Sequence, residues 1–365
     1  MRSNRKLIFW ALSLAVVFVA VDTPGQGLAP LPKAESTSPD AIIELGKTLF
    51  FDGRLSGDAT TSCATCHDPG KAFTDGLPLS AGYPGTKYFR NTPTLINASE
   101  QNYFYWDGRM SGDDLPSLVR DHIAEAHFMQ ADGRLVIERL RQIPEYEAGF
   151  KKVMGGEPSY GKILNAVAAY VSSLRSGTAP LDRYLDGDKS ALTEAAQRGL
   201  ELFQGKADCI RCHHGPFLTD DKIHVTGVPQ NEDVFGDPER HITFRRFMRT
   251  IGIGDCATLR IDIGHGCVTK QKSDTAAFRT PSLREVSRTA PYMHNGQLKT
   301  LEEVVDFYNA GGGVTDAKSR SMKSLKLTVD EKSDLVEFLM GLVSDPVDVT
   351  PPKLPPYELR ELGQF

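Results

Sequence analysis

The pattern of apolar and polar positions predicts a chain made mainly of α-helices. Ser38 and Pro39 are typical of a helix N-terminus, and the apolar residues that follow share one helical face: Ile42, Ile43, Leu45, Leu49 and Phe50. Similar spacing predicts further helices over residues 115–128, 134–154, 160–175, 192–205 and 301–308. Thr328 and Glu331 form a capping box for a last helix that runs to about Leu342. Strand patterns are sparse, so we expect a mainly α fold with long connecting loops and few strands.

The motif CxxCH occurs twice, as Cys63-Ala-Thr-Cys66-His67 and as Cys209-Ile-Arg-Cys212-His213. Two thiols separated by two residues can bond to the two vinyl groups of one porphyrin, and the adjacent histidine then lies under the iron as its proximal ligand. The pair CxxC alone also occurs in zinc and redox sites. Two copies, each with its own histidine and each in a different half of the chain, favour two covalently bound haem c groups.

Both motifs stand in the same local context. A helical segment and a short connector precede each motif, and Phe73-Thr74 or Phe217-Leu218-Thr219 follows it. A chain of 365 residues is expected to form two domains at roughly 150 residues per domain. The sequence therefore predicts two cytochrome c-like domains, each with one covalent haem, over residues 38–180 and 181–347. A Pro-rich tail over residues 348–365 closes the chain.

The N-terminus has the pattern of a targeting segment. Arg2, Arg5 and Lys6 precede an apolar run over residues 7–21. This run is shorter than the roughly 20 residues that span a bilayer, so a cleaved signal peptide over residues 1–22 is favoured, with an uncleaved anchor as the alternative. Residues 23–37 are expected to form a flexible leader. We therefore expect export to the periplasm, with no membrane contact beyond the N-terminal segment.

Composition and the remaining cysteines refine this picture. Apolar residues make up 40% of the chain and charged residues 24%, which predicts a packed core. The net charge is −5 and no basic run follows the N-terminus, so a nucleic-acid partner is not expected.

Cys256 and Cys267 lie within residues 220–278, a Gly-rich and charged stretch expected to be loop-like. In an exported protein these two cysteines are expected to form a disulfide, and two free thiols are the alternative.

The second ligand of each iron decides its chemistry, because an iron with an open side can bind peroxide. No His or Met lies between His67 and Asn91, and Tyr83 is the candidate in that loop. The first haem is therefore expected to be open. Three residues downstream of the second motif could ligate the second haem: Met293, His294 and Tyr308.

The ordered motifs resemble the bacterial di-haem cytochrome c peroxidase family, and within it the MauG-like branch. The similarity runs from about residue 40 to 342 and rests on LGKTLFFDGRLSG, CATCH, AFTDG, RNTPTL, YWDGR, CIRCH, FRTPSLR, TAPYMHNG and LEEVVDFY. The resemblance implies a peroxidatic haem at His67 and an electron-transfer haem at His213. It also implies that Trp106 relays electrons between the haems.

The resemblance implies two further ligand sets. Asn91 and the backbone carbonyls of Thr289 and Pro291 match a Ca²⁺ site between the domains, and hard oxygen donors suit this ion. Tyr308 stands where standard di-haem peroxidases place a Met and the MauG-like branch a Tyr, which implies His213/Tyr308 ligation of the second haem. A phenolate donor stabilises the ferric and higher states of the iron more than a thioether does.

The chain departs from the family pattern on the open side of the first haem. Tyr83 takes the place of a distal histidine, so no reductive opening is expected. Pro116 takes the place of a glutamine that the family uses. The acid that moves protons during peroxide cleavage is best matched by Glu125, and His122 and His127 lie nearby.

Together these features predict an exported enzyme that reduces hydrogen peroxide. Its electrons are expected from a small cytochrome c or a cupredoxin, or from side chains of a partner protein, as in MauG-like maturation of a protein-derived cofactor. The alternative is a di-haem electron carrier without catalysis, in which both irons would be six-coordinate and low-spin.

Overall fold

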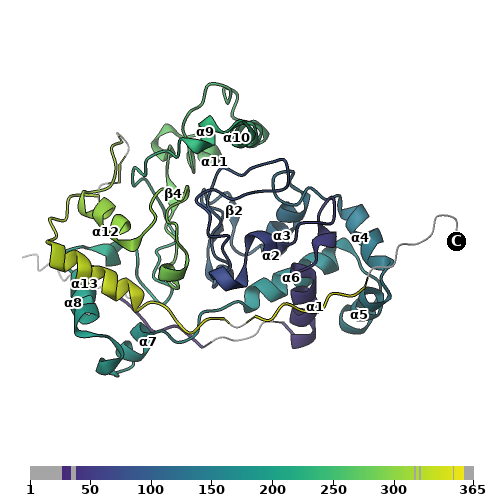
Figure 1. Cartoon of the computed structure of the whole chain (residues 1–365), viewed down its shortest axis with the longest axis horizontal. Coiled ribbons are helices and arrows are strands. Elements are labelled where there is room, and N and C mark those ends of the chain that lie inside the picture. Colours follow the sequence, from purple (N-terminus) through teal and green to yellow (C-terminus); the bar gives the residue numbers. More distant parts are fainter. Residues whose placement is uncertain (1–26, 34–37, 316–317, 320–321, 348, 357–365) are drawn as a thin grey trace, which may run out of the picture.

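The computed structural model describes residues 27–33, 38–315, 318–319, 322–347 and 349–356. The predicted signal peptide and the end of the Pro-rich tail lie outside these residues. Two groups of helices lie side by side, and a third group covers one edge where they meet (Figure 1). Within the described part of the chain, none of the helices has both the length and the apolar character that crossing a membrane requires.

The first group packs around a core that includes the fully buried Leu49, Phe50, Phe73 and Ile123. Gly46 allows close contact between the first and last helices of this group, because a Cβ atom there would lie 1.8 Å from the carbonyl oxygen of Ala166. The helices are α1 (Asp40–Phe50), α2 (Cys63–Cys66), α3 (Leu115–Ala124), α4 (Gly133–Arg141), α5 (Pro144–Met154) and α6 (Tyr160–Ser173).

The second group repeats this arrangement. Its helices are α7 (Pro180–Leu185), α8 (Glu194–Gln204), α12 (Leu301–Asn309) and α13 (Val329–Met340). Gly199 in α8 lies against α13, and a Cβ atom there would be 2.0 Å from the carbonyl oxygen of Asp334. In both groups, therefore, the helix before the CxxCH motif packs closely on the last helix through a glycine. The assignment of one haem domain to each group stays a prediction.

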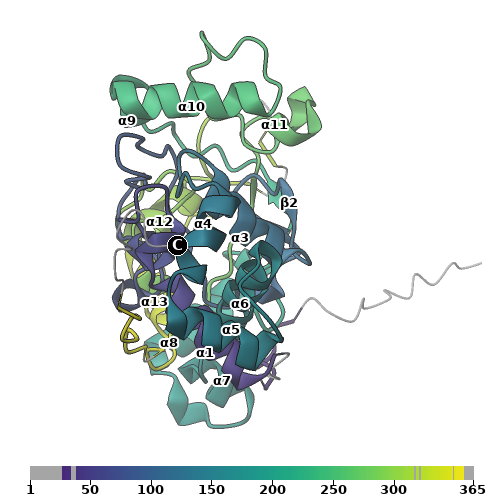
Figure 2. The same cartoon turned by 90° about the vertical axis from the view of Figure 1, so that its right-hand side faces the viewer.

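Residues 220–278 contain more helix than the sequence analysis predicted. They form α9 (Asp233–Gly236), α10 (Pro238–Thr250) and α11 (Gly266–Thr269). Figure 2 shows α10 lying across one end of the molecule. Its buried Phe244, Phe247 and Met248 pack on Tyr88 and Phe89 from the first half of the chain. We call residues 229–277, which include these helices, the excursion.

The predominantly helical fold with few strands is confirmed. Strand β1 (Tyr103–Phe104) pairs antiparallel with β2 (Met110–Ser111), and β3 (Ile223–His224) pairs antiparallel with β4 (Phe278–Arg279). Two predicted helices have different bounds. Pro144 lacks the N–H that a continuous helix needs, so residues 134–154 form α4 and α5 rather than one helix. The helix predicted over residues 115–128 ends at Ala124.

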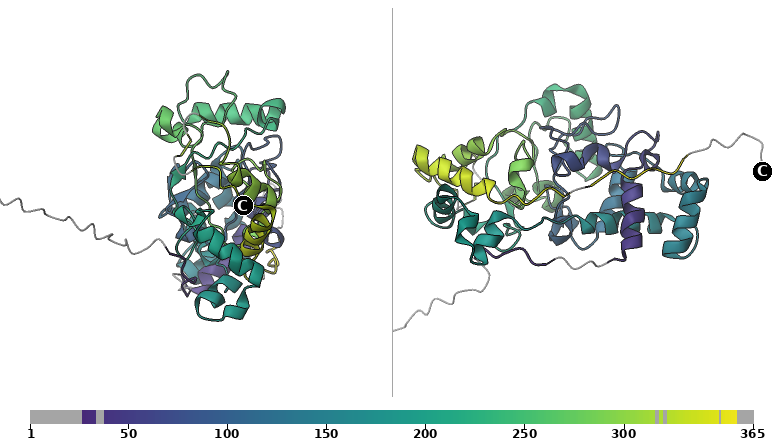
Figure 3. Two further views of the ribbon diagram at one scale, coloured as in Figure 1. Left: turned by 90° about the vertical axis from the view of Figure 1, so that its left-hand side faces the viewer. Right: turned by 60° about the horizontal axis from the view of Figure 1, so that its bottom comes forward.

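The described residues at each chain end contact the helix group that holds the other half of the chain. Leu28 forms a bridge with Gly215, and the N–H of Leu31 donates to Oδ1 of Asp182 at 2.8 Å. This part of the predicted flexible leader is therefore attached to the second group. Beyond α13, the chain runs back along the first group (Figure 3), and Val347 and Val349 pack on its core.

Candidate active site

The first CxxCH motif forms a single helical turn. Ser62 begins the turn, and its N–H donates to Oγ1 of Thr65 at 3.0 Å. His67 follows the turn and is buried. Its Nδ1 lies 3.0 Å from the carbonyl oxygen of Phe73. A carbonyl can only accept, so Nδ1 carries the proton and Nε2 keeps its lone pair for a metal.

The second motif presents its histidine in the same way. Cys209–Arg211 is a 3₁₀ turn, and Nδ1 of His213 lies 2.9 Å from the carbonyl oxygen of Leu218. Burial lowers the pKa of both His67 and His213, which keeps the two rings neutral. Two pairs of thiols and two oriented imidazoles form a donor set that fits two covalent haem groups.

A cavity surrounds the second motif and gathers several of the predicted residues. It is lined by Cys209, Cys212, His213, Trp106, Asn91, Thr289, Pro291, Met293, His294 and Tyr308. Tyr308 lines this cavity together with Cys209 and Cys212 of the second motif. Burial raises the pKa of Tyr308, and the two neighbouring thiols raise it further. All three candidate ligands for the second haem thus face the same cavity.

His294 differs from the other two candidates in its surroundings. Its ring stacks on Phe278 with the ring centres 3.6 Å apart, and its Nε2 is buried without a hydrogen-bond partner among the described residues. Its backbone carbonyl accepts from the N–H of Asn91 at 2.8 Å. The stacking fixes the ring of His294 at the wall of the cavity.

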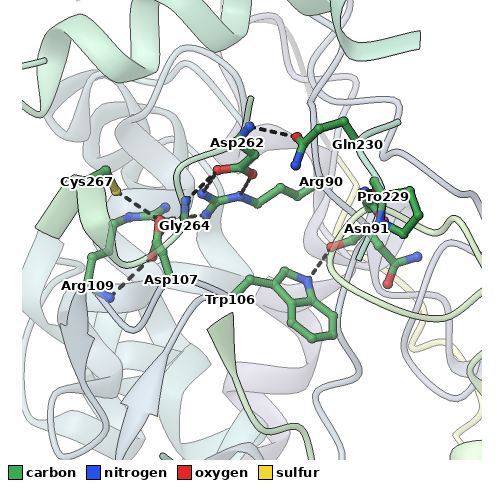
Figure 4. A network of polar contacts seen from close by, with 11 residues as sticks. Arg90, Asn91, Trp106, Asp107, Arg109, Pro229, Gln230, Asp262, Gly264 and Cys267 are labelled. Carbon is green, nitrogen blue, oxygen red and sulfur yellow. Dashed lines mark hydrogen bonds and ion pairs between the residues drawn. The ribbon is translucent and has the colours of Figure 1, made fainter. Parts of the chain in front are cut away.

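Trp106 lies at the boundary of the two helix groups. Its Nε1 donates to the backbone carbonyl of Asn91 at 2.9 Å (Figure 4). The side-chain Nδ2 of Asn91 donates to the carbonyl of Leu77 at 2.9 Å, so its Oδ1 remains as an acceptor. Since Asn91, Thr289 and Pro291 line one cavity, their oxygen atoms suit the predicted calcium site.

A buried ionic network beside Trp106 was not found from the sequence. Arg90 is 1% exposed and binds Asp107 at 2.6 Å and Asp262 at 2.7 Å. Arg109 binds Asp107 at 3.0 Å (Figure 4). Burial alone would raise the pKa of Asp107, but the guanidinium groups of Arg109 and Arg90 lower it to about 2. The motifs RNTPTL and YWDGR contain three of these residues, yet neither motif indicates their partner Asp262.

The predicted disulfide is absent. Cys256 and Cys267 are both buried free thiols within the apolar cluster of the excursion. The thiol of Cys267 points to the ionic network instead, with its Sγ 3.8 Å from Oδ2 of Asp107.

The two predicted acid–base candidates near the first CxxCH motif, His122 and Glu125, have different surroundings. We call the surroundings of this motif the first site. His122 on α3 lies close to His67, with the ring centres 6.3 Å apart. The ring of His122 also stacks on Tyr105 and on Phe128, at 5.6 Å and 4.4 Å. By contrast, Glu125 follows the last residue of α3 and is exposed. The geometry therefore favours His122 over Glu125 as the group beside His67.

Three other polar groups surround the first site. The hydroxyl of Tyr105 and Nε2 of His127 are buried without a hydrogen-bond partner among the described residues. Orphaned polar atoms of this kind indicate that a further group belongs here. The hydroxyl of Tyr83 accepts from the N–H of Asp58 at 2.9 Å, so Tyr83 is tied to the connector that precedes the motif.

Comparisons with known proteins identify the family of the chain. The family described as di-haem cytochrome c peroxidase matches residues 40–190. The cytochrome-c peroxidase IdrP2 of Denitromonas iodatirespirans is 48% identical, over 100% of this chain and 99% of its own length. The methylamine utilization protein MauG of Methylorubrum extorquens is 36% identical, over 89% of this chain and 84% of its own length.

The fold has a solved counterpart. A MauG-like protein associated with microbial copper homeostasis superimposes with a TM-score of 0.72 and 29% identity, over 89% of this chain and 95% of its own. The similarity therefore covers both helix groups. The chain belongs to the di-haem cytochrome c peroxidase family, which includes MauG-like members, and it is an oxidoreductase of that family.

Proposed function

We propose that this protein is an exported peroxidase that reduces hydrogen peroxide at a haem held by Cys63, Cys66 and His67. Cys209, Cys212 and His213 would hold a second haem, which would supply the entry point for electrons from outside. The observation that supports this division of roles is the difference between the two sites. Both motifs hold the proximal histidine through the same kind of hydrogen bond, but Tyr308 lines the cavity at the second motif, whereas His122 lies beside His67 of the first.

Each residue near the first site has a definite task in this proposal. A haem with one open side supplies the iron that binds and cleaves peroxide. His67 holds the proximal side, and its bond to the carbonyl of Phe73 fixes the ring. His122 takes a proton from the incoming peroxide and returns it to the leaving oxygen, which must depart as water. Glu125 keeps a supporting role, as an exposed carboxylate at the end of α3.

Around the second site, Tyr308 would help to hold the haem at His213. Its phenolate would keep the reduction potential of that haem low. Trp106, fixed by its bond to Asn91, carries electrons between the two sites. Asn91, Thr289 and Pro291 would hold Ca²⁺, which would stabilise the boundary of the two helix groups.

Two sources of electrons fit the proposal. A small cytochrome c or a cupredoxin would give plain peroxidase activity. Oxidation of a partner protein's side chains would give the role suggested by similarity to MauG. Export to the periplasm, which the N-terminal pattern predicts, fits either role.

Electron paramagnetic resonance of the oxidised protein tests the proposal. We expect a high-spin ferric signal from the haem at His67, a low-spin signal from the haem at His213, and loss of the high-spin signal on addition of hydrogen peroxide. Two low-spin signals that do not respond to hydrogen peroxide would instead identify an electron carrier without catalysis.

A further inference from the structure

Arg240, in the first turn of α10, is bonded to the loop that follows the first CxxCH motif. Its Nη1 donates to the carbonyl oxygen of Ser80 at 2.9 Å and to that of Tyr88, and its Nη2 donates to that of Leu79 at 3.3 Å. These carbonyls lie 152 to 161 residues earlier in the chain. A planar guanidinium that bonds three carbonyls of one loop restricts the movement of that loop.

Two further contacts join the loop, residues 79–90, to α10. Nζ of Lys87 lies 2.6 Å from the carboxylate of Asp237, the residue that caps α10. The ring of Phe89 packs on Phe244 and Phe247, at 5.3 Å and 5.2 Å between centres. Polar and apolar contacts therefore connect the same loop to the same helix.

The other side of the loop faces the first site. Oγ of Ser80 lies 4.0 Å from Sγ of Cys66, one of the two haem-attaching thiols. The N–H of Tyr83 donates to the carbonyl of His127 at 3.2 Å, and the ring of Tyr88 stacks on that of His127 at 5.1 Å. The loop is thus enclosed between α10 and the residues around the first site.

The contacts of His127 show what the loop restrains. Its Nε2 is buried and has no hydrogen-bond partner among the described residues. Its ring is held by the stack with Tyr88 and by contacts with Phe128 and Phe247. An imidazole nitrogen without a partner is a strong iron ligand once it is free to move.

We propose that Arg240 is a positioning residue that keeps the loop 79–90, and with it Tyr83 and His127, away from the iron at His67, so that peroxide finds an open coordination side. The inference rests on the function proposed above. It assigns a role to α10, which touches neither CxxCH motif in the contacts described above.

The test compares the haem-loaded protein with three variants. Arg240→Ala removes all three bonds, and Arg240→Lys keeps the charge but cannot reach three carbonyls in one plane. Arg249→Ala is the control, because it removes the same charge from an exposed position of the same helix. Hydrogen exchange of residues 79–90 should be about tenfold faster or more in Arg240→Ala, intermediate in Arg240→Lys and unchanged in Arg249→Ala.

The spin state of the first haem separates positioning from general stability. In Arg240→Ala, part of the high-spin ferric signal should change to a low-spin signal, and that fraction should not react with hydrogen peroxide. Unchanged exchange of residues 79–90 in Arg240→Ala would overturn the inference. So would faster exchange with an unaltered high-spin signal. If the unmodified protein has no high-spin signal, the proposed function fails, while the exchange data still decide whether Arg240 holds the loop.

Discussion

Asp262 holds the guanidinium of Arg90 from one side, so replacing it with alanine should destabilise the fold. Nε and Nη2 of Arg90 donate to the two carboxylate oxygens of Asp262 at 2.7 Å and 2.9 Å, and Arg90 is 1% exposed. Without Asp262, these two donors stay buried and lose their carboxylate partner. Gly264 also loses an acceptor for its N–H, which lies 3.0 Å from Oδ1.

Removing one partner of a buried ion pair costs about 3–5 kcal/mol, because the remaining charge is left unpaired. Arg90 keeps Asp107 at 2.6 Å, so we expect the lower half of that range. With a urea m value of about 3 kcal/mol per M, the midpoint of unfolding should fall by about 1 M. The assay is urea unfolding of the haem-loaded protein, followed by circular dichroism in the far ultraviolet.

Asp334→Ala provides a matched control. Asp334 also binds an arginine through both oxygens, at 2.7 Å and 2.8 Å, but the side chain of its partner Arg198 is 58% exposed. Water can solvate Arg198 after the change, so the cost should be only about 0–1 kcal/mol. Equal shifts in the two variants would refute the argument that burial of Arg90 sets the cost.

Three other predictions address the sites. Tyr308→Met should raise the reduction potential of the haem at His213 in a spectroelectrochemical titration, because a thioether favours ferrous iron; an unchanged low-spin spectrum and potential would exclude Tyr308 as a ligand. His122→Gln should slow the reaction with hydrogen peroxide about 10²-fold in stopped flow, whereas Glu125→Gln should have little effect, and the reverse order would return the role to Glu125. The pKa of Asp107 is lowered from 3.8 to about 2, so its contribution to stability is complete above about pH 4 and is lost as the pH falls toward 2; urea midpoints that do not fall between pH 4 and pH 2.5 would contradict this.

The sequence predicted the helices that carry strong local signals. The capping box of Thr328 and Glu331 begins α13, with the N–H of Glu331 donating to Oγ1 of Thr328 at 3.2 Å. By contrast, the sequence analysis did not predict α10, because arginines stand between its apolar residues and weaken the apolar pattern. Asp237 and Pro238 nevertheless give a helix-start signal there, since Asp237 accepts from two N–H groups of the first turn. Weighing that signal would have found the helix.

The sites were predictable only as far as their chemistry is local. Each CxxCH motif fixes its own histidine within a few residues, through the carbonyl of Phe73 or of Leu218. The bond between Arg90 and Asp262 joins residues 172 positions apart, and no spacing rule connects them. The structure leaves Cys256 and Cys267 as free thiols, and the contact of Cys267 with Asp107 also spans 160 positions, so no spacing rule connects these two residues.

The difference between local contacts and contacts across the chain also explains how two nearly identical motifs can serve different roles. The turn at Cys63 and the turn at Cys209 hold their histidines through the same kind of hydrogen bond, so His67 and His213 are presented alike. What differs comes from elsewhere in the chain, because α3 brings His122 to the first motif and α12 brings Tyr308 to the second. An exchange of the two CxxCH turns alone should therefore leave the spin states of both haems in place, whereas changes in α3, α10 or α12 should alter them.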